Sequence, residues 1–180
     1  MLLSAAGCAL LIGAARAQIR GDHWYECAPM GRQYAFDDLI IEAAARHQVE
    51  PALLKTIVWQ ESRFDPAKVH DGGYGLMQIG KGTGMEWAAV HHVENFMMSD
   101  LLDARTNLHA GAWYVRQLLD HWRGADDPTM FALAEYVAGR QALQQWACGS
   151  LRAETLRGAM EGTAAGQFVD RVLKRMRMAR

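Results

Sequence analysis

A glutamate near the end of a predicted helix is the first candidate for chemistry. The apolar pattern predicts a helix over residues 51–62, in which Glu61 follows Leu54 by seven positions and Ile57 by four. Because a helix repeats every 3.6 residues, this spacing places Glu61 on or beside the apolar face. Burial and the negative end of the helix dipole both favour the neutral acid, which is the form that protonates a leaving oxygen in glycosidases. The alternative is an ordinary salt bridge at the helix end, with Arg63 as the partner.

A segment dense in glycine follows that helix. Between residues 63 and 84, glycine recurs at irregular intervals. Glycine at this density indicates backbone with unusual dihedral angles, or backbone that approaches a ligand closely. A phosphate-binding loop is excluded, because no lysine followed by Ser or Thr stands where such a loop requires it. The glycines are Gly72, Gly73, Gly75, Gly80, Gly82 and Gly84.

The rest of the pattern is helical. Asp37 and Asp38 are expected to cap a helix whose apolar residues recur at helical spacing, and Pro51 suits the first turn of the helix that carries Glu61. Further helices are expected over residues 104–122, 129–137, 140–147 and 163–178. No segment shows a convincing strand pattern. We therefore predict an all-α fold arranged around the glycine-rich loop.

The first 17 residues have the pattern of a secretory signal peptide. An apolar run from Leu2 to Ala14, interrupted only by Ser4, ends at the small-x-small sequence Ala15-Arg16-Ala17. We expect cleavage near Ala17, export to the periplasm or cell envelope, and an irregular lead-in over residues 18–34. Cys8 lies inside the apolar run, which argues against a lipoprotein anchor. The alternative is a buried N-terminal helix.

The composition limits the classes of function. The chain has 180 residues, of which 51% are hydrophobic and 22% charged, so it fits one folded domain and not a disordered segment. Cleavage lowers the number of basic residues from 19 to 18 against 20 acidic residues, so the net charge changes from −1 to −2. This charge gives no case for nucleic acid as the main partner.

Export would leave two cysteines, Cys27 and Cys148. In an oxidising compartment they can pair and tie the N-terminal segment to the late helical region. Two free thiols are an equal alternative, because the sequence alone does not give the distance between the two residues.

Four blocks of residues stand in a characteristic order along the chain. They are Glu61-Ser62-Arg63-Phe64-Asp65-Pro66, Gly75-Leu76-Met77-Gln78-Ile79, Asn107 with Gly111 and Tyr114, and Ala134-Glu135-Tyr136-Val137-Ala138-Gly139. In this order they resemble the catalytic domain of the soluble lytic transglycosylases, which has a lysozyme-like fold. The resemblance covers residues 35–147, and residues 167–175 resemble the helix that closes such domains. We therefore expect a catalytic domain over residues 35–180.

The resemblance implies that Glu61 is the catalytic residue of a peptidoglycan lytic transglycosylase. Glu61 would protonate the glycosidic oxygen between N-acetylmuramic acid and N-acetylglucosamine. As a carboxylate it would then take the proton of the 6-hydroxyl group, which closes a 1,6-anhydro ring. A single acid and base agrees with the lack of a second Asp or Glu in a comparable motif, whereas other glycosidases use two carboxylates. The expected partner is the peptidoglycan strand, and no cofactor or metal is expected.

The resemblance also implies which residues surround the sugar. Ser62 follows the catalytic glutamate, and the loop that lines the cleft contains Gly75, Met77 and Gln78. Gly75 would let the backbone approach the sugar, Met77 would provide an apolar contact, and Gln78 would offer a donor and an acceptor to an acetamido group. Tyr136 corresponds to the family tyrosine beside the glutamate, where it could hydrogen-bond the acid. Without the motif, Met77 and Tyr136 would be taken for core residues.

Two residues depart from the family pattern. Val137 stands where the family usually has asparagine, and the loss of one hydrogen bond typically weakens binding by about 1–3 kcal/mol. His70 stands where a small hydroxyl residue is usual, so it either contacts the substrate or is an exposed loop histidine. The family proline near Lys81 is also absent. Two alternatives stay open: a water-using muramidase of the same fold and, because of Val137 and His70, a catalytically weakened peptidoglycan-binding protein.

The remaining titratable residues indicate no second site. His91 and His92 lack a third ligand at a telling spacing, so we predict no metal site. A basic face near the C-terminus is expected to be solvated, with contact to anionic wall polymers as the alternative. Most tryptophans are expected in the core, and the chain is expected to act as a monomer. The basic face consists of Arg171, Lys174, Arg175, Arg177 and Arg180.

Overall fold

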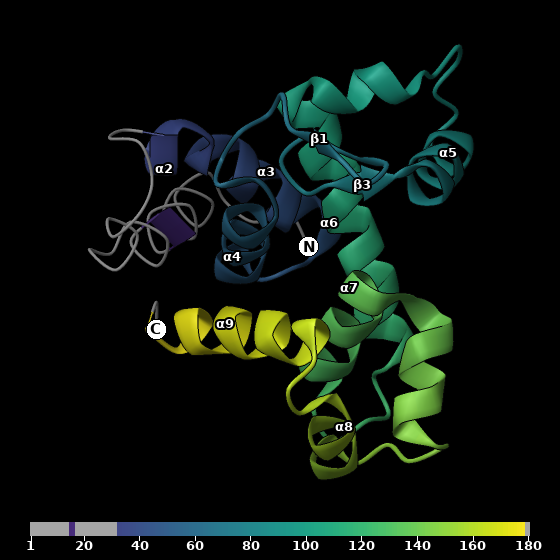
Figure 1. Ribbon diagram of the computed structural model, residues 1–180. Helices are drawn as coiled ribbons and strands as arrows, with labels where there is room; N and C mark the ends of the chain where they lie inside the picture. The colour runs from purple at the N-terminus through teal and green to yellow at the C-terminus, as the bar shows by residue number, and fades with distance from the viewer. Residues whose placement is uncertain (1–14, 17–31, 179–180) are drawn as a thin grey trace, which may run out of the picture.

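The computed structural model describes residues 15–16 and 32–178, and helices dominate it (Figure 1). The labelled helices are α2 (Arg32–Ala35), α3 (Asp37–His47), α4 (Pro51–Ser62), α5 (Lys81–Val90), α6 (Ala104–His121), α7 (Pro128–Ala147), α8 (Ala153–Met160) and α9 (Ala164–Met178), with a 3-10 helix η2 (Met98–Leu102). The strands β1 (Val69–His70), β2 (Gly73–Tyr74) and β3 (Ile79–Gly80) form a small antiparallel sheet. In this sheet Val69 pairs with Tyr74, and Gly73 pairs with Gly80.

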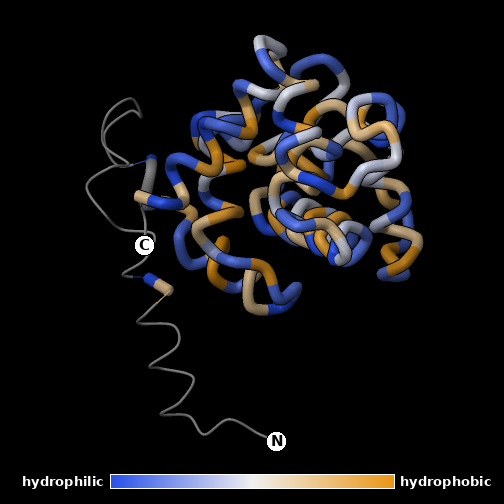
Figure 2. Tube along the Cα trace, turned by 90° about the horizontal axis from the view of Figure 1, so that it is seen from below, coloured by the Kyte–Doolittle hydropathy of each residue, from blue (hydrophilic) through white to orange (hydrophobic). Residues whose placement is uncertain are grey.

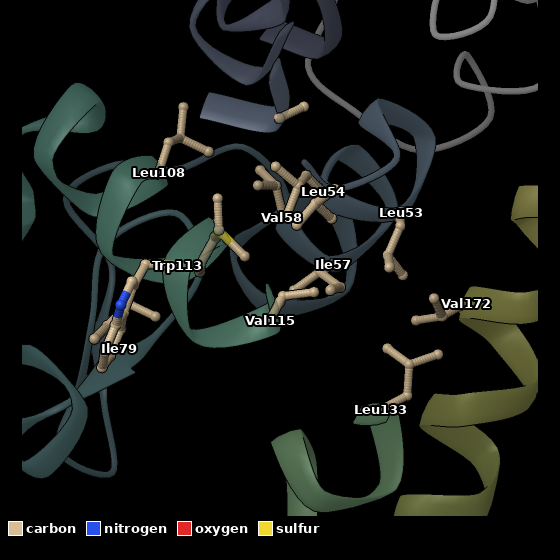
Figure 3. Packing of buried hydrophobic residues seen from close by; sticks show 14 of the residues in the cluster. Leu53, Leu54, Ile57, Val58, Ile79, Leu108, Trp113, Val115, Leu133 and Val172 are labelled. Carbon is tan, nitrogen blue, oxygen red and sulfur yellow. The ribbon is translucent and has the colours of Figure 1, made fainter. Parts of the chain in front are cut away.

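Helices α4 and α6 form the centre of the fold. Helix α6 packs against α3, α5 and α7, and α4 packs against α3 and α9. Figure 3 shows Leu53 and Ile57 of α4 on the side of Leu133 in α7 and Val172 in α9. Each such side chain contributes about 1.5–3 kcal/mol when it is fully buried. Because α4 is packed in this way along its length, the position of Glu61 at its end is fixed by the core.

The predicted helices are present, and the structure adds elements that periodicity did not reveal. The helices predicted over residues 51–62, 104–122 and 163–178 correspond to α4, α6 and α9, and the two predicted over residues 129–137 and 140–147 together correspond to α7. The break in α7 is at Gly139, whose backbone is not helical (φ 79°, ψ 162°). Helices α5 and α8 were not predicted, nor was the sheet, since strands of two residues are too short to show an alternating pattern. Hydrophobic and hydrophilic segments follow one another along the chain in Figure 2, as expected for amphipathic helices that pack around a core.

The predicted cap of α3 by Asp37 and Asp38 is wrong. The N-cap of α3 is Phe36, and Asp37 lies inside the first turn, where its buried carboxylate accepts a hydrogen bond from Nζ of Lys55 at 2.6 Å. Caps of the expected type occur elsewhere: the Asp103 side chain caps α6 and the Asp127 side chain caps α7. The glycine-rich segment is also more regular than expected, because α5 already begins at Lys81.

Several expectations concern residues outside the described part of the chain. These include the signal peptide apart from residues 15–16, Cys8, most of the 18–34 segment, Cys27 and Arg180. Residues 32–34, expected to be irregular, belong to the short helix α2. Cys148 is exposed, with its Sγ 3.0 Å from the carbonyl oxygen of Gln145. Within residues 15–16 and 32–178, no helix is both long and apolar enough to cross a membrane.

The basic C-terminal face takes part in packing as well as facing solvent. Nε of Arg171 donates to the side chain of Gln60 at 3.1 Å, and the guanidinium of Arg175 lies 5.2 Å from the ring centre of Trp59. These contacts join α9 to α4. Trp59, Trp87 and Trp113 are buried, as predicted for most tryptophans.

Three histidine rings meet where α3, α5 and α6 come together. The ring centre of His47 in α3 lies 5.5 Å from that of His109 in α6 and 6.1 Å from that of His91 at the end of α5. Nε2 of His47 is 3.4 Å from Nδ1 of His109, so one proton at most can lie between these two nitrogens. Burial lowers the pKa of His47 to about 4, assisted by the other two histidines and by Arg46.

Replacing His47 by glutamine is expected to make the fold less sensitive to acid. The histidine has a pKa near 6.5 when unfolded and about 4 when folded. Its contribution to stability is therefore complete above pH 6.5 and is lost as the pH falls towards 4. Because the ring is partly exposed, we expect about 1 kcal/mol at pH ~5, which is roughly 3 °C in the melting temperature.

Melting curves at about pH 7.5 and about pH 5 test this expectation. The exposed His92, replaced by asparagine, is the matched control. The acid-induced drop should be smaller in His47→Gln than in the wild type and the control. An equal drop in all three proteins would contradict the role of His47.

Candidate active site

A groove opens where the end of α4 meets the sheet, the start of α5, and helices α6 and α7. Its volume is about 470 Å³. Five of the predicted site residues line it: Glu61, His70, Gln78, Tyr136 and Val137. The structure adds Lys68, Asp71, Gly72, Gly73, Ile79, Gly80, Thr83 and Tyr114. Ser62, Gly75 and Met77 do not line the groove.

The carboxyl of Glu61 is the most perturbed acid in this groove. The side chain is half-buried in the last turn of α4. Burial raises its pKa from 4.5 to about 7, although the positive charge of Lys68 acts in the opposite direction. Desolvation therefore outweighs the nearby charge and favours the neutral acid form of Glu61.

The alternative reading of Glu61 as a salt-bridge residue is not supported. Within the described part of the chain, its carboxylate is in no ion pair. Arg63, the expected partner, turns away: its guanidinium lies 4.1 Å from the ring centre of Trp59, and its Nη1 donates to the Trp59 carbonyl at 2.8 Å. The left-handed backbone of Arg63 (φ 54°) ends α4 and directs its side chain to that position.

Three of the residues predicted to contact the sugar make their contacts inside the protein in this structure. Ser62 is buried, and its hydroxyl donates to the Val58 carbonyl at 3.0 Å. Met77 is fully buried and packs against Gly111, where an added Cβ would lie 2.2 Å from the Met77 sulfur. Gly75 has φ +70°, and a Cβ there would lie 2.3 Å from the Leu101 carbonyl oxygen. The close approach that requires glycine is thus to the protein's own backbone.

The side chain of Asn107 anchors the glycine-rich loop through hydrogen bonds. It is fully buried on α6. Its Oδ1 accepts from the Met77 amide at 2.8 Å, and its Nδ2 donates to the carbonyls of Tyr74 at 2.7 Å and Leu101 at 2.8 Å. One side chain therefore satisfies three backbone groups, the most distant of which lies 33 residues from Asn107 in the sequence.

Gln78 faces the groove, but only half of its amide is available to a ligand. Its Nε2 donates to the carbonyls of Lys68 at 3.0 Å and Gly75 at 2.8 Å. Both amide hydrogens are thus engaged within the loop, and Oε1 is the acceptor that a substrate N–H or O–H group can use. The expectation of a donor to the substrate is not met in this conformation.

Tyr136 stands beside the catalytic candidate, as the resemblance implies, but its proton goes elsewhere. Its hydroxyl donates to the Met77 carbonyl at 2.5 Å, so it does not donate to Glu61. Burial, with the negative charge of Glu61 as the second cause, raises the pKa of Tyr136 well above 10. Its ring lies 5.7 Å from that of Tyr114. The two rings form an aromatic wall on the side of α6 and α7.

The two residues that depart from the family pattern both face the groove. Val137 is 37% exposed, so its apolar surface is presented to a ligand. His70 is exposed on β1, and its Nε2 lies 3.2 Å from the carboxylate of Asp71. Within residues 15–16 and 32–178, no group of three or more His, Cys, Asp or Glu side chains is placed to hold a metal ion.

A comparison with known proteins identifies the family. The family described as the transglycosylase SLT domain matches residues 38–155. The chain belongs to this family. The matched range contains the groove and all of its lining residues, whereas α9 lies beyond it.

Relatives of this SLT domain include the membrane-bound lytic murein transglycosylase F of Desulfosudis oleivorans, which is 34% identical over 108 residues, 58% of this chain and 22% of that protein. The lytic transglycosylase Slt of Pseudomonas aeruginosa, solved as an inactive mutant, has a TM-score of 0.72 and 22% identity, over 81% of this chain and 24% of that one. The 70 kDa soluble lytic transglycosylase of Escherichia coli has a TM-score of 0.73 and 23% identity, over 95% and 28%. These structures confirm the predicted helical, lysozyme-like fold. The chain spans about a quarter of the length of these relatives.

Proposed function

We propose that this SLT domain is a peptidoglycan lytic transglycosylase, which cleaves the β-1,4 bond between N-acetylmuramic acid and N-acetylglucosamine. The observation that carries the proposal is Glu61, a half-buried acid with a pKa of about 7 in a groove of about 470 Å³. The names of the relatives, lytic murein transglycosylase and soluble lytic transglycosylase, support the same substrate class.

The reaction requires one group that is an acid first and a base second. The neutral Glu61 donates its proton to the glycosidic oxygen while the acetamido group of the muramic residue assists at the anomeric carbon. Glu61, now a carboxylate, removes the proton of the 6-hydroxyl group, whose oxygen closes the 1,6-anhydro ring. The pKa near 7 suits both steps, because the two forms of Glu61 then differ little in free energy. No water is consumed.

Asp71 is the residue on which the water-using alternative can be tested. Among the groove-lining residues of the described chain, it is the only other carboxylate. Its side chain is 88% exposed and paired with His70, so it lacks the confined position that a nucleophile or base would have. If the enzyme hydrolysed its substrate, Asp71→Asn would be expected to abolish activity. Under the proposal, this variant retains most activity.

Mass spectrometry of the products from purified peptidoglycan tests the proposed reaction. Products with 1,6-anhydro ends are expected. Reducing ends, which are heavier by one water or about 18 mass units, would instead show hydrolysis. Binding to peptidoglycan without any product would favour the catalytically weakened wall-binding protein, in which Val137 replaces the usual asparagine.

The pH dependence of the rate is a further prediction. Because the acid form of Glu61 starts the reaction, kcat/KM should be constant below its pKa and fall tenfold per pH unit above about 7. Initial rates of release of anhydro-ended fragments between about pH 5 and pH 9 check this. A rate that rises through neutral pH would contradict the role of Glu61 as the acid.

The wider setting of the domain is proposed with the reaction. We propose that the catalytic unit covers residues 35–180, because α9 packs on α4 and α7, beyond the matched range. Peptidoglycan as the substrate supports export to the periplasm or cell envelope, and the D. oleivorans relative is membrane-bound by name. The domain is proposed to act as a monomer, and Gln78, Tyr136, Val137 and His70 are proposed to contact the glycan.

A further inference from the structure

Lys68 lies in the groove and contacts the same helix turn as Glu61. Its Nζ donates to the main-chain carbonyl of Glu61. This carbonyl belongs to the last turn of α4, where the helix leaves carbonyl groups without internal partners. The ammonium therefore caps the C-terminal end of α4 and interacts favourably with its dipole.

The backbone of Lys68 is hydrogen-bonded to the glycine-rich loop that carries Gly75 and Gln78, which we call the groove loop. Its carbonyl accepts a hydrogen bond from the Gly75 amide at 2.8 Å and another from Nε2 of Gln78 at 3.0 Å. One residue thus connects the turn that carries Glu61 to the loop that carries Gln78. The chain between Glu61 and Lys68 has to reverse direction for this, through the left-handed residues Arg63 and Phe64 (φ 54° and 62°).

The position of the ammonium also matters electrostatically. It donates to the carbonyl of Glu61. Among the ion pairs of residues 15–16 and 32–178, none joins this ammonium to the Glu61 carboxylate. A direct ion pair would hold Glu61 ionised at rest, and the first proton transfer would fail. At its observed place the charge is too weak to overcome burial, yet it favours the carboxylate that forms when the proton leaves.

We propose that Lys68 is a positioning residue for Glu61, which fixes the last turn of α4 against the groove loop and stabilises the carboxylate formed in the first step. This rests on the proposed function for its catalytic consequence. The electrostatic part, that the ammonium favours the ionised form of Glu61, stands without it.

The catalytic consequence is tested with Lys68→Met and Lys68→Arg, and with Lys81→Met as the matched control on a lysine that does not line the groove. In Lys68→Met the plateau of kcat/KM should fall roughly 3- to 10-fold, and its alkaline limb should move up by about one pH unit. Lys68→Arg should keep the limb near its wild-type pH, and Lys81→Met should change neither quantity. A lower plateau with an unshifted limb would reduce Lys68 to a structural role and overturn the proposal.

A readout without activity separates this proposal from the proposed function. Glu61→Gln is introduced with and without Lys68→Met, and the change in melting temperature that it causes is measured at about pH 5 and about pH 8. At the higher pH, Glu61→Gln should raise the melting temperature more when Lys68 is replaced, because the ionised Glu61 has then lost its favourable charge. An equal gain in both backgrounds would overturn the proposal, even if anhydro products are formed. A larger gain without any products would refute the proposed reaction and leave the role of Lys68 intact.

Discussion

Glu61→Gln is expected to abolish transglycosylase activity and, at the same time, to stabilise the fold above neutral pH. Glutamine has nearly the shape of the neutral acid but cannot donate a proton to the glycosidic oxygen or accept one from the 6-hydroxyl group. Because the same residue serves both steps, kcat should fall by at least about 10³-fold. Release of anhydro-ended fragments measures this loss.

The stability of Glu61→Gln has a defined pH dependence. The pKa of Glu61 is about 7 in the fold and 4.5 when unfolded, so the folded state binds the proton more tightly. Stability from this group is complete below pH 4.5 and is lost as the pH rises to 7. Glutamine does not ionise, so the variant should be about 2 kcal/mol more stable at pH ~8 and equal to the wild type at pH ~4.

Urea unfolding at the two pH values measures this difference, with the exposed Glu86→Gln on α5 as the control. Glu86→Gln should change neither activity nor the pH dependence of stability. A Glu61→Gln variant with activity within tenfold of the wild type would refute the assigned role. A stability gain that does not depend on pH would show instead that Glu61 is not a buried, perturbed acid.

Asn107→Ala is expected to be the most damaging change away from Glu61. The substitution leaves three buried backbone groups without partners: the Met77 amide and the carbonyls of Tyr74 and Leu101. Each such group costs about 1–3 kcal/mol, so we expect a loss of about 4 kcal/mol in the free energy of unfolding. Activity should fall as well, because Tyr136 and Gln78 are both bonded to the loop that Asn107 holds.

Urea unfolding compares Asn107→Ala with Gln117→Ala, an exposed amide on the same helix. Asn107→Asp keeps the acceptor for the Met77 amide but loses both donors and places a buried carboxylate against the two carbonyl oxygens. It should therefore be at least as unstable as Asn107→Ala at neutral pH. A loss below about 1 kcal/mol in Asn107→Ala would show that water replaces the lost partners and that the loop does not depend on this residue.

The sequence predicted the site where a local rule applied. The period of α4 placed Glu61 at the border of the core, and the ordered blocks placed Tyr136 and Gln78 near it. Which side chains of the loop point into the core and which point into the groove was not predictable. Met77 and Gln78 are neighbours in the same motif, yet Met77 enters the core and Gln78 faces the groove. Which of them faces outward depends on the hydrogen bonds of Asn107 and on the space above Gly111, and both belong to α6.

The sequence by itself determined the all-α class, the helices α4, α6, α7 and α9, and the position of Glu61 at the edge of the core, because helical periodicity is a local property of the chain. Only the tertiary structure decided that Ser62, Gly75 and Met77 make their contacts inside the protein and that Lys68, Asp71 and Thr83 line the groove. It also set the pKa of Glu61 near 7, because desolvation depends on how α4, the sheet and α7 pack around the carboxyl. Burial and opposing charge are sums over neighbours that are distant in sequence, so no local pattern contains them.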